Sequence, residues 1–513
     1  MRQIIRLRGM VFSLLWVASI LFSPVFSVSE GAMADELILG ATTGLRNLEV
    51  HWMGAQEIAV NWHVYEPLVW LDADGSIKPM LAESWTVSND GLEWAFKLRP
   101  GVKFSDGTDF DAEDAAANIQ RQIDSIIKKE PTSFAFMYAD VAKVEVVNKH
   151  TFKIICRERI GPLLNYLSIL LMIPKEAVEK WGPKRITEIL PGTGPYVKKS
   201  QVPNQGAELV ANPNYWKKGL PVVPRMTYRE FREDATMVNA LRRGEVDVIQ
   251  PVNHEFIPLL RADKNITVES FLPYEKIFVA LKCDKAPFNN LKARQAFTYA
   301  VDRKLIVDTL LKGAGRPAGA FIQEGMPGYA PHLKAPVRDL AKAKQLLKES
   351  GYDGRKLKFI APPEWYTATR ESSEAITAMM QEAGFNVELT ILEGGAFTNA
   401  RLTGAFDLHF LGSRAITGEP QRYLDERIVT DLYKSGWVHK ETFDLIKEAG
   451  RTIDSKAKEK LYFRIQEIMY DEVAPQAFMH QAHGFYAYRN NVKNFKMLPT
   501  FTFYTPAVAK HKE

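Results

Sequence analysis

The sequence predicts a mixed α/β protein with two separate hydrophobic cores. Stretches with the alternating pattern of strands and stretches with the apolar period of helices follow one another through most of the chain. Residues 35–273 and 278–479 are each long enough to bury a core of their own. No internal repeat or low-complexity segment interrupts this order, so a globular protein with two main units is expected.

The first half of the chain contains several strand patterns and one well-marked helix. The stretches with a strand pattern are residues 36–40, 64–70 and 94–98. The turn at 72–75 follows the second of them, because Asp side chains bond nearby amides and glycine accepts a positive φ. Asp111, with a second acid at Asp114, is typical of a capped helix start and predicts a helix over 112–127.

The second half repeats the alternation of helices and strands. Apolar residues at helical spacing predict a helix from 293 to 301, capped by Asn289 or Asn290, and Asp302 is suited to cap the next helix. The remaining predicted elements are a helix from Leu340 to Leu347 closed by Gly351, a strand at 357–360, a helix at 371–383 and a strand at 387–392.

The composition is that of a folded globular protein with no nucleic-acid partner. The 513 residues are 46% hydrophobic and 25% charged. Lysine and arginine (66) barely exceed aspartate and glutamate (61), and the charges are interspersed without a basic block. Aromatic residues make up 11% of the chain, enough for a large core and for rings that line a ligand cleft.

The first 34 residues have the pattern of a cleaved signal peptide. Basic residues precede a mostly apolar stretch at 10–22, which is too short to span a bilayer core of about 30 Å as a helix. An A-x-A sequence at 32–34 then supplies a cleavage site before Asp35. We therefore expect an exported, periplasmic protein that is cleaved after Ala34, with an N-terminal membrane anchor as the alternative.

Common catalytic signatures are missing from the sequence. It contains no G-x-S-x-G, no phosphate-binding loop, no G-x-G-x-x-G and no H-E-x-x-H. His480 and His483 have a spacing that suits metal ligation on a helix, but no third ligand is visible, so exposed or hydrogen-bonded histidines are the preferred interpretation. The sequence therefore favours a binding protein without catalytic residues, a metal or a cofactor.

Two further groups of residues are interpreted as structural. The aspartates at 72–74 and 106–111 lack the full spacing of a calcium loop and suit turns and caps. Cys156 and Cys283 are the two cysteines of the chain, and they form either one disulfide or two buried thiols.

Specific motifs resemble one protein family along nearly the whole of residues 35–513. These motifs are VYEPLV at 64–69, GSIKPMLAESW at 75–85, LRPGVKFSDG at 98–107, GTGPY at 192–196, NPNYW at 212–216, LRRGEVD at 241–247, APF at 286–288, RQA at 294–296 and YAVDR at 299–303. In this order they resemble the family 5 solute-binding proteins, the extracytoplasmic receptors of peptide/nickel ABC importers.

The resemblance implies a periplasmic-binding-protein fold of type II. This fold has two lobes joined by two hinge strands, an extra subdomain inserted in the first lobe, and a ligand enclosed by hinge closure. The implied divisions are the signal peptide at 1–34, lobe 1 at 35–60, the inserted subdomain at 61–189, lobe 1 again at 190–276, lobe 2 at 277–481 and the last part of lobe 1 at 482–513. The joins near Pro273 and His480 are the expected hinge crossings.

The stretch FLGSRAITGEP at 410–420 resembles a loop of lobe 2 that faces the cleft in this family. Peptide receptors usually carry an Asp there for the peptide α-ammonium, where this chain has Ile416, although Glu419-Pro420 retains the pair that follows. Nickel receptors place Trp, Tyr and a later His at positions that differ here. Those matching positions are Arg414, Gly418 and Leu432. These departures argue against an ordinary peptide and against a nickel chelate.

Arg414 points to the chemistry of the ligand. Its guanidinium offers a planar fork of donors that suits a carboxylate or phosphate, which predicts an anionic or amino-acid-like solute. The alternatives are that Arg414 pairs with Glu419 or lies exposed on the loop. Further positions expected at the cleft, from the resemblance or from their place after a strand, are Trp52, Met53, Phe134, Trp365, Tyr366, Arg370, Thr417 and Glu419.

These observations predict the substrate-binding receptor of an ABC importer. We expect a monomer that captures a small solute and delivers it to permease subunits in the inner membrane. The alternative ligands are a di- or oligopeptide or a metal–chelator complex. An exported hydrolase would need a nucleophile and a base that the sequence does not display, and an exported peptide-binding chaperone is the remaining alternative from another class.

Overall fold

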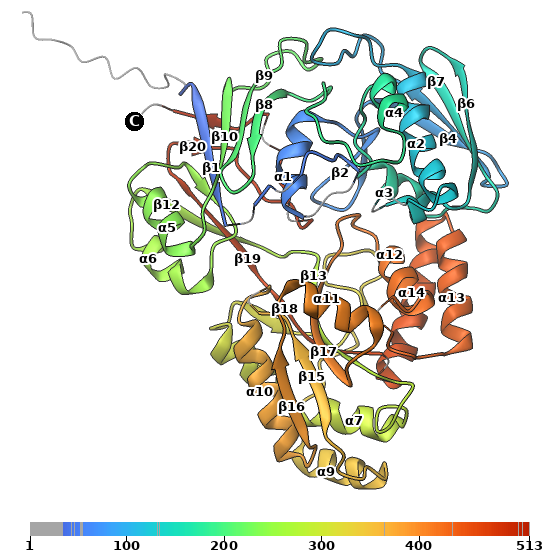
Figure 1. Cartoon of the computed structure of the whole chain (residues 1–513), viewed down its shortest axis with the longest axis vertical. Coiled ribbons are helices and arrows are strands. Elements are labelled where there is room, and N and C mark those ends of the chain that lie inside the picture. Colours follow the sequence, from blue (N-terminus) through green and yellow to red (C-terminus); the bar gives the residue numbers. More distant parts are fainter. Residues whose placement is uncertain are drawn as a thin grey trace, which may run out of the picture.

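The computed structural model describes most of the chain. The described residues are 34–511 apart from Thr43, Arg46, 52–54, Pro131, Ser133, Glu364, Tyr433, Ala474, Phe501 and Thr505. The expected signal peptide up to residue 33 and the candidate site residues Trp52 and Met53 lie outside this part. Figure 1 shows two lobes, one above the other, with the first lobe extended to the right by a subdomain.

Lobe 1 is built on a sheet whose central strands are parallel. Its strands are β1 (Glu36–Ala41), β8 (Tyr196–Val202), β9 (Gly206–Ala211), β10 (Arg225–Glu230), β11 (Val248–Ile249), β12 (Ile266–Phe271) and β19 (Gly484–Arg489). They follow the order β12-β19-β11-β1-β10-β9-β8, with β1 parallel to β10 and β11. Parallel strands must be covered on both faces. Helices α5 (Asp234–Arg242) and α6 (Ile257–Arg261) contribute to a core on one face, and the subdomain side covers the other.

Lobe 2 is a second mixed sheet surrounded by helices. Its strands are β13 (Glu275–Leu281), β14 (Gly315–Pro317), β15 (Leu357–Ala361), β16 (Val387–Ile391), β17 (Leu408–Arg414) and β18 (Gln476–Ala482), in the order β14-β18-β13-β17-β15-β16. Its helices are α7 (Leu291–Ala300), α8 (Arg303–Leu305), α9 (Leu340–Glu349), α10 (Thr369–Glu382), α11 (Gly394–Thr403), α12 (Gln421–Leu424), α13 (Lys440–Arg451) and α14 (Ser455–Asp471). β13 lies at the centre and is buried along its whole length.

The subdomain contains an antiparallel sheet covered by one long helix. Its elements are β2 (Val69–Leu71), β3 (Ile77–Pro79), β4 (Ala82–Val87), β5 (Glu93–Leu98), β6 (Val141–Asn148), β7 (Thr151–Cys156), α2 (Ala112–Ile127), α3 (Leu163–Leu167) and α4 (Lys175–Trp181). The main sheet has the order β4-β5-β7-β6, and α2 packs on it. The predicted capping box is confirmed, because Asp111 accepts from the Glu113 amide and Asp114 accepts from the Asp111 amide.

One continuous core joins lobe 1 to the subdomain. Leu37 and Leu39 of β1 belong to the same buried cluster as Phe96 of β5 and Ile119 of α2, whereas lobe 2 has a cluster of its own. Because rotation would have to break this shared core, the subdomain and lobe 1 form one unit. Helix α1 (Ala55–Val64) lies between them, and the short strands β20 (Val492–Lys493) and β21 (Ala509–Lys510) close the chain on lobe 1.

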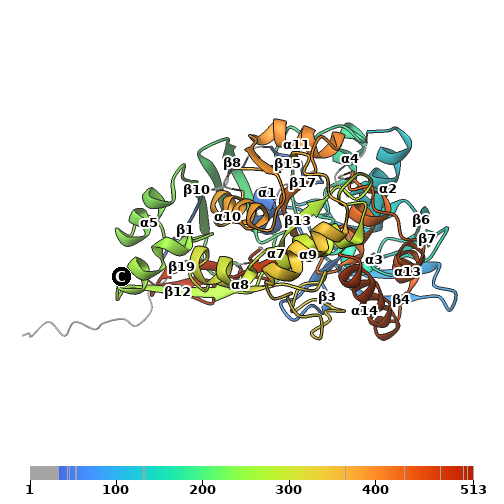
Figure 2. The same ribbon diagram turned by 90° about the horizontal axis from the view of Figure 1, so that it is seen from below.

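The two lobes are joined by two short connections that lie next to each other. Residues 272–274 lead from β12 to β13, and His483 leads from β18 to β19. β12 pairs with β19 in lobe 1, and β13 pairs with β18 in lobe 2; Figure 2 shows β12 and β19 next to each other. Pro273 lies in the first connection as expected. His480 lies within β18, so the second crossing is three residues later than expected.

The structure corrects two local predictions and decides between two alternatives for the cysteines. The stretch 64–70 is not one strand, because α1 includes Val64 and β2 starts only at Val69. The interpretation of His480 as exposed or hydrogen-bonded is wrong, because it is buried in β18 and neither ring nitrogen has a hydrogen-bond partner among the described residues. His480 and His483 also share no helix face. Cys156 and Cys283 do not form a disulfide; they are buried free thiols, one at the end of β7 in the subdomain and the other in the turn after β13 in lobe 2. Within the described residues, no helix combines the length and the apolar character needed to cross a bilayer.

Candidate functional site

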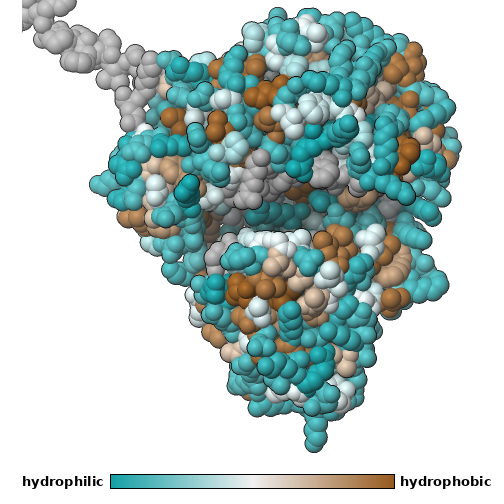
Figure 3. All heavy atoms as spheres, in the orientation of Figure 1, coloured by the Kyte–Doolittle hydropathy of each residue, from teal (hydrophilic) through white to brown (hydrophobic). Residues whose placement is uncertain are grey.

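The carboxyl ends of parallel strands in both lobes point toward the space between the lobes. In lobe 2, β15, β16 and β17 are parallel to one another, and in lobe 1, β1, β10 and β11 are parallel. The space-filling view shows the surface hollowed between the lobes at this level (Figure 3). Ligands of open α/β sheets bind at such strand ends, so this cleft is the candidate site.

Arg414 and Glu275 form an ion pair at the cleft edge of lobe 2. They face each other across the β13–β17 pair, and Nε of Arg414 lies 2.5 Å from Oε2 of Glu275. About a third of the Arg414 side chain (34%) is exposed, against 11% for Glu275. Although burial lowers the pKa of the Arg414 guanidinium, the charge of Glu275 and its hydrogen bond outweigh burial and raise it. Arg414 is therefore a fixed cation that solvent or a ligand can reach.

Tyr366 and Trp365 lie near the same edge, after β15. The Tyr366 hydroxyl donates to the Gly412 carbonyl at 3.2 Å, and a Cβ at residue 412 would lie only 2.3 Å from the Tyr366 ring. Glycine is thus required for the ring to lie against β17. Burial raises the pKa of Tyr366 to about 12, so its hydroxyl stays protonated. Trp365 is 39% exposed and contacts Phe397 edge-on, with 5.3 Å between ring centroids.

Thr417 and Glu419 are buried within the loop that follows β17. Oε1 of Glu419 accepts a hydrogen bond from Tyr462 of α14, and Oε2 lies 3.4 Å from Nζ of Lys458. The expected alternative in which Arg414 pairs with Glu419 is therefore wrong, because each has another partner. Thr417 donates to the Glu419 carbonyl at 3.2 Å. Both side chains support the shape of the loop in this structure.

Phe134 lies where the subdomain meets lobe 2. It is buried, and the Arg422 guanidinium of α12 lies over its ring at 5.8 Å. Nearby, Nδ2 of Asn165 donates to the Thr417 carbonyl at 3.0 Å. Both views show α13 and α14 beside the subdomain (Figures 1 and 2). Arg370 is an exposed residue at the start of α10.

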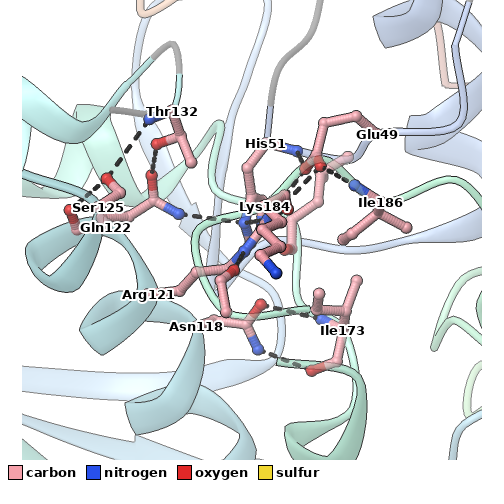
Figure 4. Close-up of polar contacts among 12 residues, drawn as sticks. Glu49, His51, Asn118, Arg121, Gln122, Ser125, Thr132, Ile173, Lys184 and Ile186 are labelled. Carbon is pink, nitrogen blue, oxygen red and sulfur yellow. Dashed lines mark hydrogen bonds and ion pairs between the residues drawn. The ribbon is translucent and has the colours of Figure 1, made fainter. Parts of the chain in front are cut away.

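A different ionic network holds the segment before α1 to the subdomain (Figure 4). Arg121 of α2 pairs with Glu49 through both carboxylate oxygens, at 2.9 and 3.2 Å, and donates to the carbonyls of Gly182 and Lys184. Its Nη1 also contacts Nδ1 of His51 at 2.7 Å, and Nε2 of His51 lies 2.8 Å from the Leu171 carbonyl. The carbonyl requires a proton on Nε2, so Nδ1 accepts.

Electrostatics favour a charged pair beside a neutral imidazole in this network. Burial alone would raise the pKa of Glu49, but the hydrogen bond and charge of Arg121 outweigh it, and the pKa is lowered. Burial, together with the Arg121 charge, lowers the pKa of His51 to about 4. The side chains of Arg121 and Glu49 have no exposed surface. This network therefore has no room for a ligand and is structural.

Sequence reasoning missed Glu275, the partner of Arg414. It lies next to the predicted hinge, but a pairing across 139 residues depends on strand register and carries no local signal. Among the described residues, the structure shows no group of three or more His, Cys, Asp or Glu side chains placed to hold a metal ion.

Comparison with known sequences gives one family across most of the chain. The family model of bacterial extracellular solute-binding proteins, family 5 (middle region), matches residues 76–428. The glutathione-binding protein GsiB of Escherichia coli strain K12 is 28% identical over 431 residues, which cover 81% of this chain and 82% of that protein.

Comparison with solved structures gives the same fold. The periplasmic binding protein DppA of Helicobacter pylori, in complex with the peptide STSA, superposes with a TM-score of 0.81 at 22% identity, covering 94% of this chain and 99% of that chain. NikZ of Campylobacter jejuni, in complex with Ni(L-His), gives 0.79 at 20% identity, covering 92% of this chain and 97% of that chain. At these identities the similarity shows the fold alone, and it confirms the expected two-lobe architecture.

Proposed function

Because the chain belongs to the bacterial extracellular solute-binding proteins of family 5, we propose that it is the substrate-binding receptor of an ABC importer. It captures a small solute between the lobes and delivers it to the permease subunits in the inner membrane. The observation that carries the proposal is the pair of adjacent connections beneath a cleft edged by parallel strand ends. Such a hinge allows two rigid bodies to close on a ligand.

The ligand is a small anionic solute with amino-acid-like or peptide-like groups. The partly exposed Arg414, held in place by Glu275, supplies a cation for a carboxylate. The relative GsiB is named for glutathione, a tripeptide with two carboxylates and one ammonium. A ligand of this kind could bind Arg414 with a carboxylate, with Tyr366 and Trp365 beside it. The predicted cleft residues Trp52, Met53, Phe134, Arg370, Thr417 and Glu419 remain proposals.

Two alternatives concern the ligand and the class of protein. DppA and NikZ were solved with a peptide and with Ni(L-His), which keeps a di- or oligopeptide and a metal chelate as alternative ligands. An exported peptide-binding chaperone is the alternative from another class. We propose that the protein binds without turnover and as a monomer.

Native mass spectrometry of protein purified from its own host tests the proposal directly. A retained small solute, followed by one-to-one calorimetric titration with that solute and a smaller radius of gyration in solution scattering, is the expected result. Glutathione, dipeptides and Ni(L-His) are the first probes. Unchanged dimensions at saturation, conversion of the solute to product, or weak binding to many unfolded proteins would contradict the receptor.

Export is tested separately on the intact protein. The exported chain should have the mass of a polypeptide that starts at Asp35. A retained leader in the soluble exported fraction would contradict cleavage after Ala34.

A further inference from the structure

A cavity of about 190 Å³ lies in lobe 2 beside the hinge. Lys276 of β13, Arg316 of β14, Gln323, Lys334 and Gln481 of β18 contribute to its lining. Nε2 of Gln481 donates to the carbonyl of Pro273, in the first connection between the lobes, at 2.9 Å.

The cavity and the Arg414 site occupy opposite faces of the lobe 2 sheet. Successive side chains of a strand point to opposite faces, so Lys276 is turned away from the side on which Glu275 meets Arg414. Phe278, on the same face as Lys276, contacts the Arg427 guanidinium from the helical turn after α12. A ligand in this cavity would therefore not compete directly for Arg414.

Lys276 is a buried amine without an acidic partner in the described part of the chain. The residue is 1% exposed, and Nζ donates to the Phe321 carbonyl at 2.7 Å while lying over the rings of Phe321 and Phe478. Burial, reinforced by the charge of Arg427, lowers the pKa of Lys276 well below its usual range. A buried ammonium is costly unless an opposite charge compensates it. An anion in the cavity would supply that charge.

Gln323 provides a second, independent indication of a ligand. The residue is 4% exposed, and among the described residues its Nε2 has no hydrogen-bond partner although it is buried. Buried N–H donors in native proteins almost always have an acceptor. The acceptor missing here would be an oxygen of the bound molecule.

The charges around the cavity favour a doubly negative ligand. Arg316 is compensated by its ion pair with Glu324, whereas no ion pair is formed by Lys276 or Lys334 with the described residues. With Lys276 protonated, the lining therefore has an excess of two positive charges. We propose that this cavity binds a small dianionic oxyanion, such as phosphate or a short dicarboxylate, between Lys276 and Gln323.

Calorimetric titration of the mature protein with sodium phosphate and, separately, with sodium succinate tests the proposal. Saturable one-to-one binding of either anion is expected, and the anion that binds identifies the source of the oxyanion. Lys276→Met, which keeps most of the length of the side chain and removes the charge, should weaken this binding at least tenfold. Gln323→Leu should weaken it several-fold. Lys344→Met, on the exposed surface of α9 in the same lobe, is the matched control and should bind like wild type.

Melting curves without anion establish that each variant folds, and Gln323→Leu decides the test if Lys276→Met does not fold. Binding of neither anion, or equal affinity in wild type and in the folded cavity variants, would overturn the proposal. Loss of anion binding in Arg414→Ala would place the ion in the cleft and would also overturn it. The proposed receptor function can fail without affecting this outcome, because no transported solute is present.

Discussion

Arg121 and Arg414 are both arginines paired with a glutamate, yet they occupy opposite environments. Arg121 is fully buried, and its donors are engaged by Glu49, His51 and two backbone carbonyls. Arg414 is held by Glu275, and 34% of its side chain is exposed at the cleft edge. The pairing alone therefore says little about role. The accessible surface that remains after pairing separates a structural arginine from a candidate binding residue.

The largest expected effect comes from breaking the buried network. Arg121→Met leaves the Glu49 carboxylate buried without its counter-charge, and removing one partner of a buried pair costs about 3–5 kcal/mol. Denaturant unfolding followed by circular dichroism should show this loss in the transition of lobe 1 and the subdomain. Lys304→Met removes an exposed pair with Asp308 and should change the free energy of unfolding by about 0–1 kcal/mol. Equal effects of the two substitutions would remove the distinction between buried and exposed pairs.

Arg414 should affect solute binding more than folding. If a ligand carboxylate binds this guanidinium, Arg414→Ala should weaken affinity by about 2–5 kcal/mol, where each 1.4 kcal/mol or so is a factor of ten. Arg414→Lys keeps the charge but loses the planar fork, so it should restore only part of the affinity. Calorimetric titration with the identified solute, beside melting curves, makes the measurement. The same affinity in all three proteins would exclude Arg414 from the site.

Two buried histidines, His51 and His480, differ in their hydrogen-bond partners, and their burial affects how stability depends on pH. His51 has partners on both ring nitrogens, whereas both ring nitrogens of His480 are buried and unbonded within the described residues. Burial lowers the pKa of His480 to about 4, against an ordinary value of 6.5. The unfolded chain therefore binds this proton more readily, so the contribution of His480 to stability is complete above pH 6.5 and is lost as the pH falls toward 4.

The variant His480→Leu isolates this contribution. Between pH 6.5 and 4 it should lose less stability than wild type, by at most about 1.4 kcal/mol per pH unit. Unfolding curves at several pH values in that window make the comparison. Other groups, such as Asp425, whose pKa burial raises to about 7, change stability with pH in the opposite direction. Their contribution is the same in both proteins, so it cancels in the difference. Parallel curves for the two proteins would show that His480 is not held neutral.

The smallest effect concerns the contact between the subdomain and lobe 2. Asn165→Ala removes one hydrogen bond to the Thr417 carbonyl, worth about 0.5–1.5 kcal/mol. Solution scattering of the ligand-free protein should show a slight increase in the radius of gyration, and solute affinity should change by less than about tenfold. Thr403→Val, on the exposed end of α11, removes a hydrogen bond within one lobe and serves as the control. A large loss of affinity in Asn165→Ala would instead make Asn165 part of the site.

Helix caps and the order of several elements could be predicted from the sequence, whereas contacts between distant segments could not. The start of α2 at Asp111 and the caps Asn290 and Asp302 follow from side chains that bond amides a few residues away. The stretch 64–70 was wrongly predicted as one strand because the apolar end of α1 and the apolar strand β2 follow each other closely in the sequence. Within lobe 2, the order α7, α9, β15, α10 and β16 was also predicted, since it depends on periodicity.

The candidate site was predicted only in part for the same reason. The position of Arg414 followed from the resemblance of its loop, but the partner Glu275 depends on the register between β13 and β17. Arg121 and Glu49 are 72 residues apart, and no local pattern connects them. Such pairs become visible only when the fold brings distant segments together.

The two neighbouring connections at 272–274 and His483 allow a small rotation near the hinge to produce a large displacement far from it. With both connections on adjacent strands, the lobes can turn about little more than one axis, and displacement grows with distance from that axis. Figure 1 places α13 and the subdomain on the far side of the molecule from β12 and β19. A small rotation imposed by a solute near the axis thus becomes a larger movement at α13 and the subdomain. The distance between these two surfaces therefore depends on the size of the captured solute.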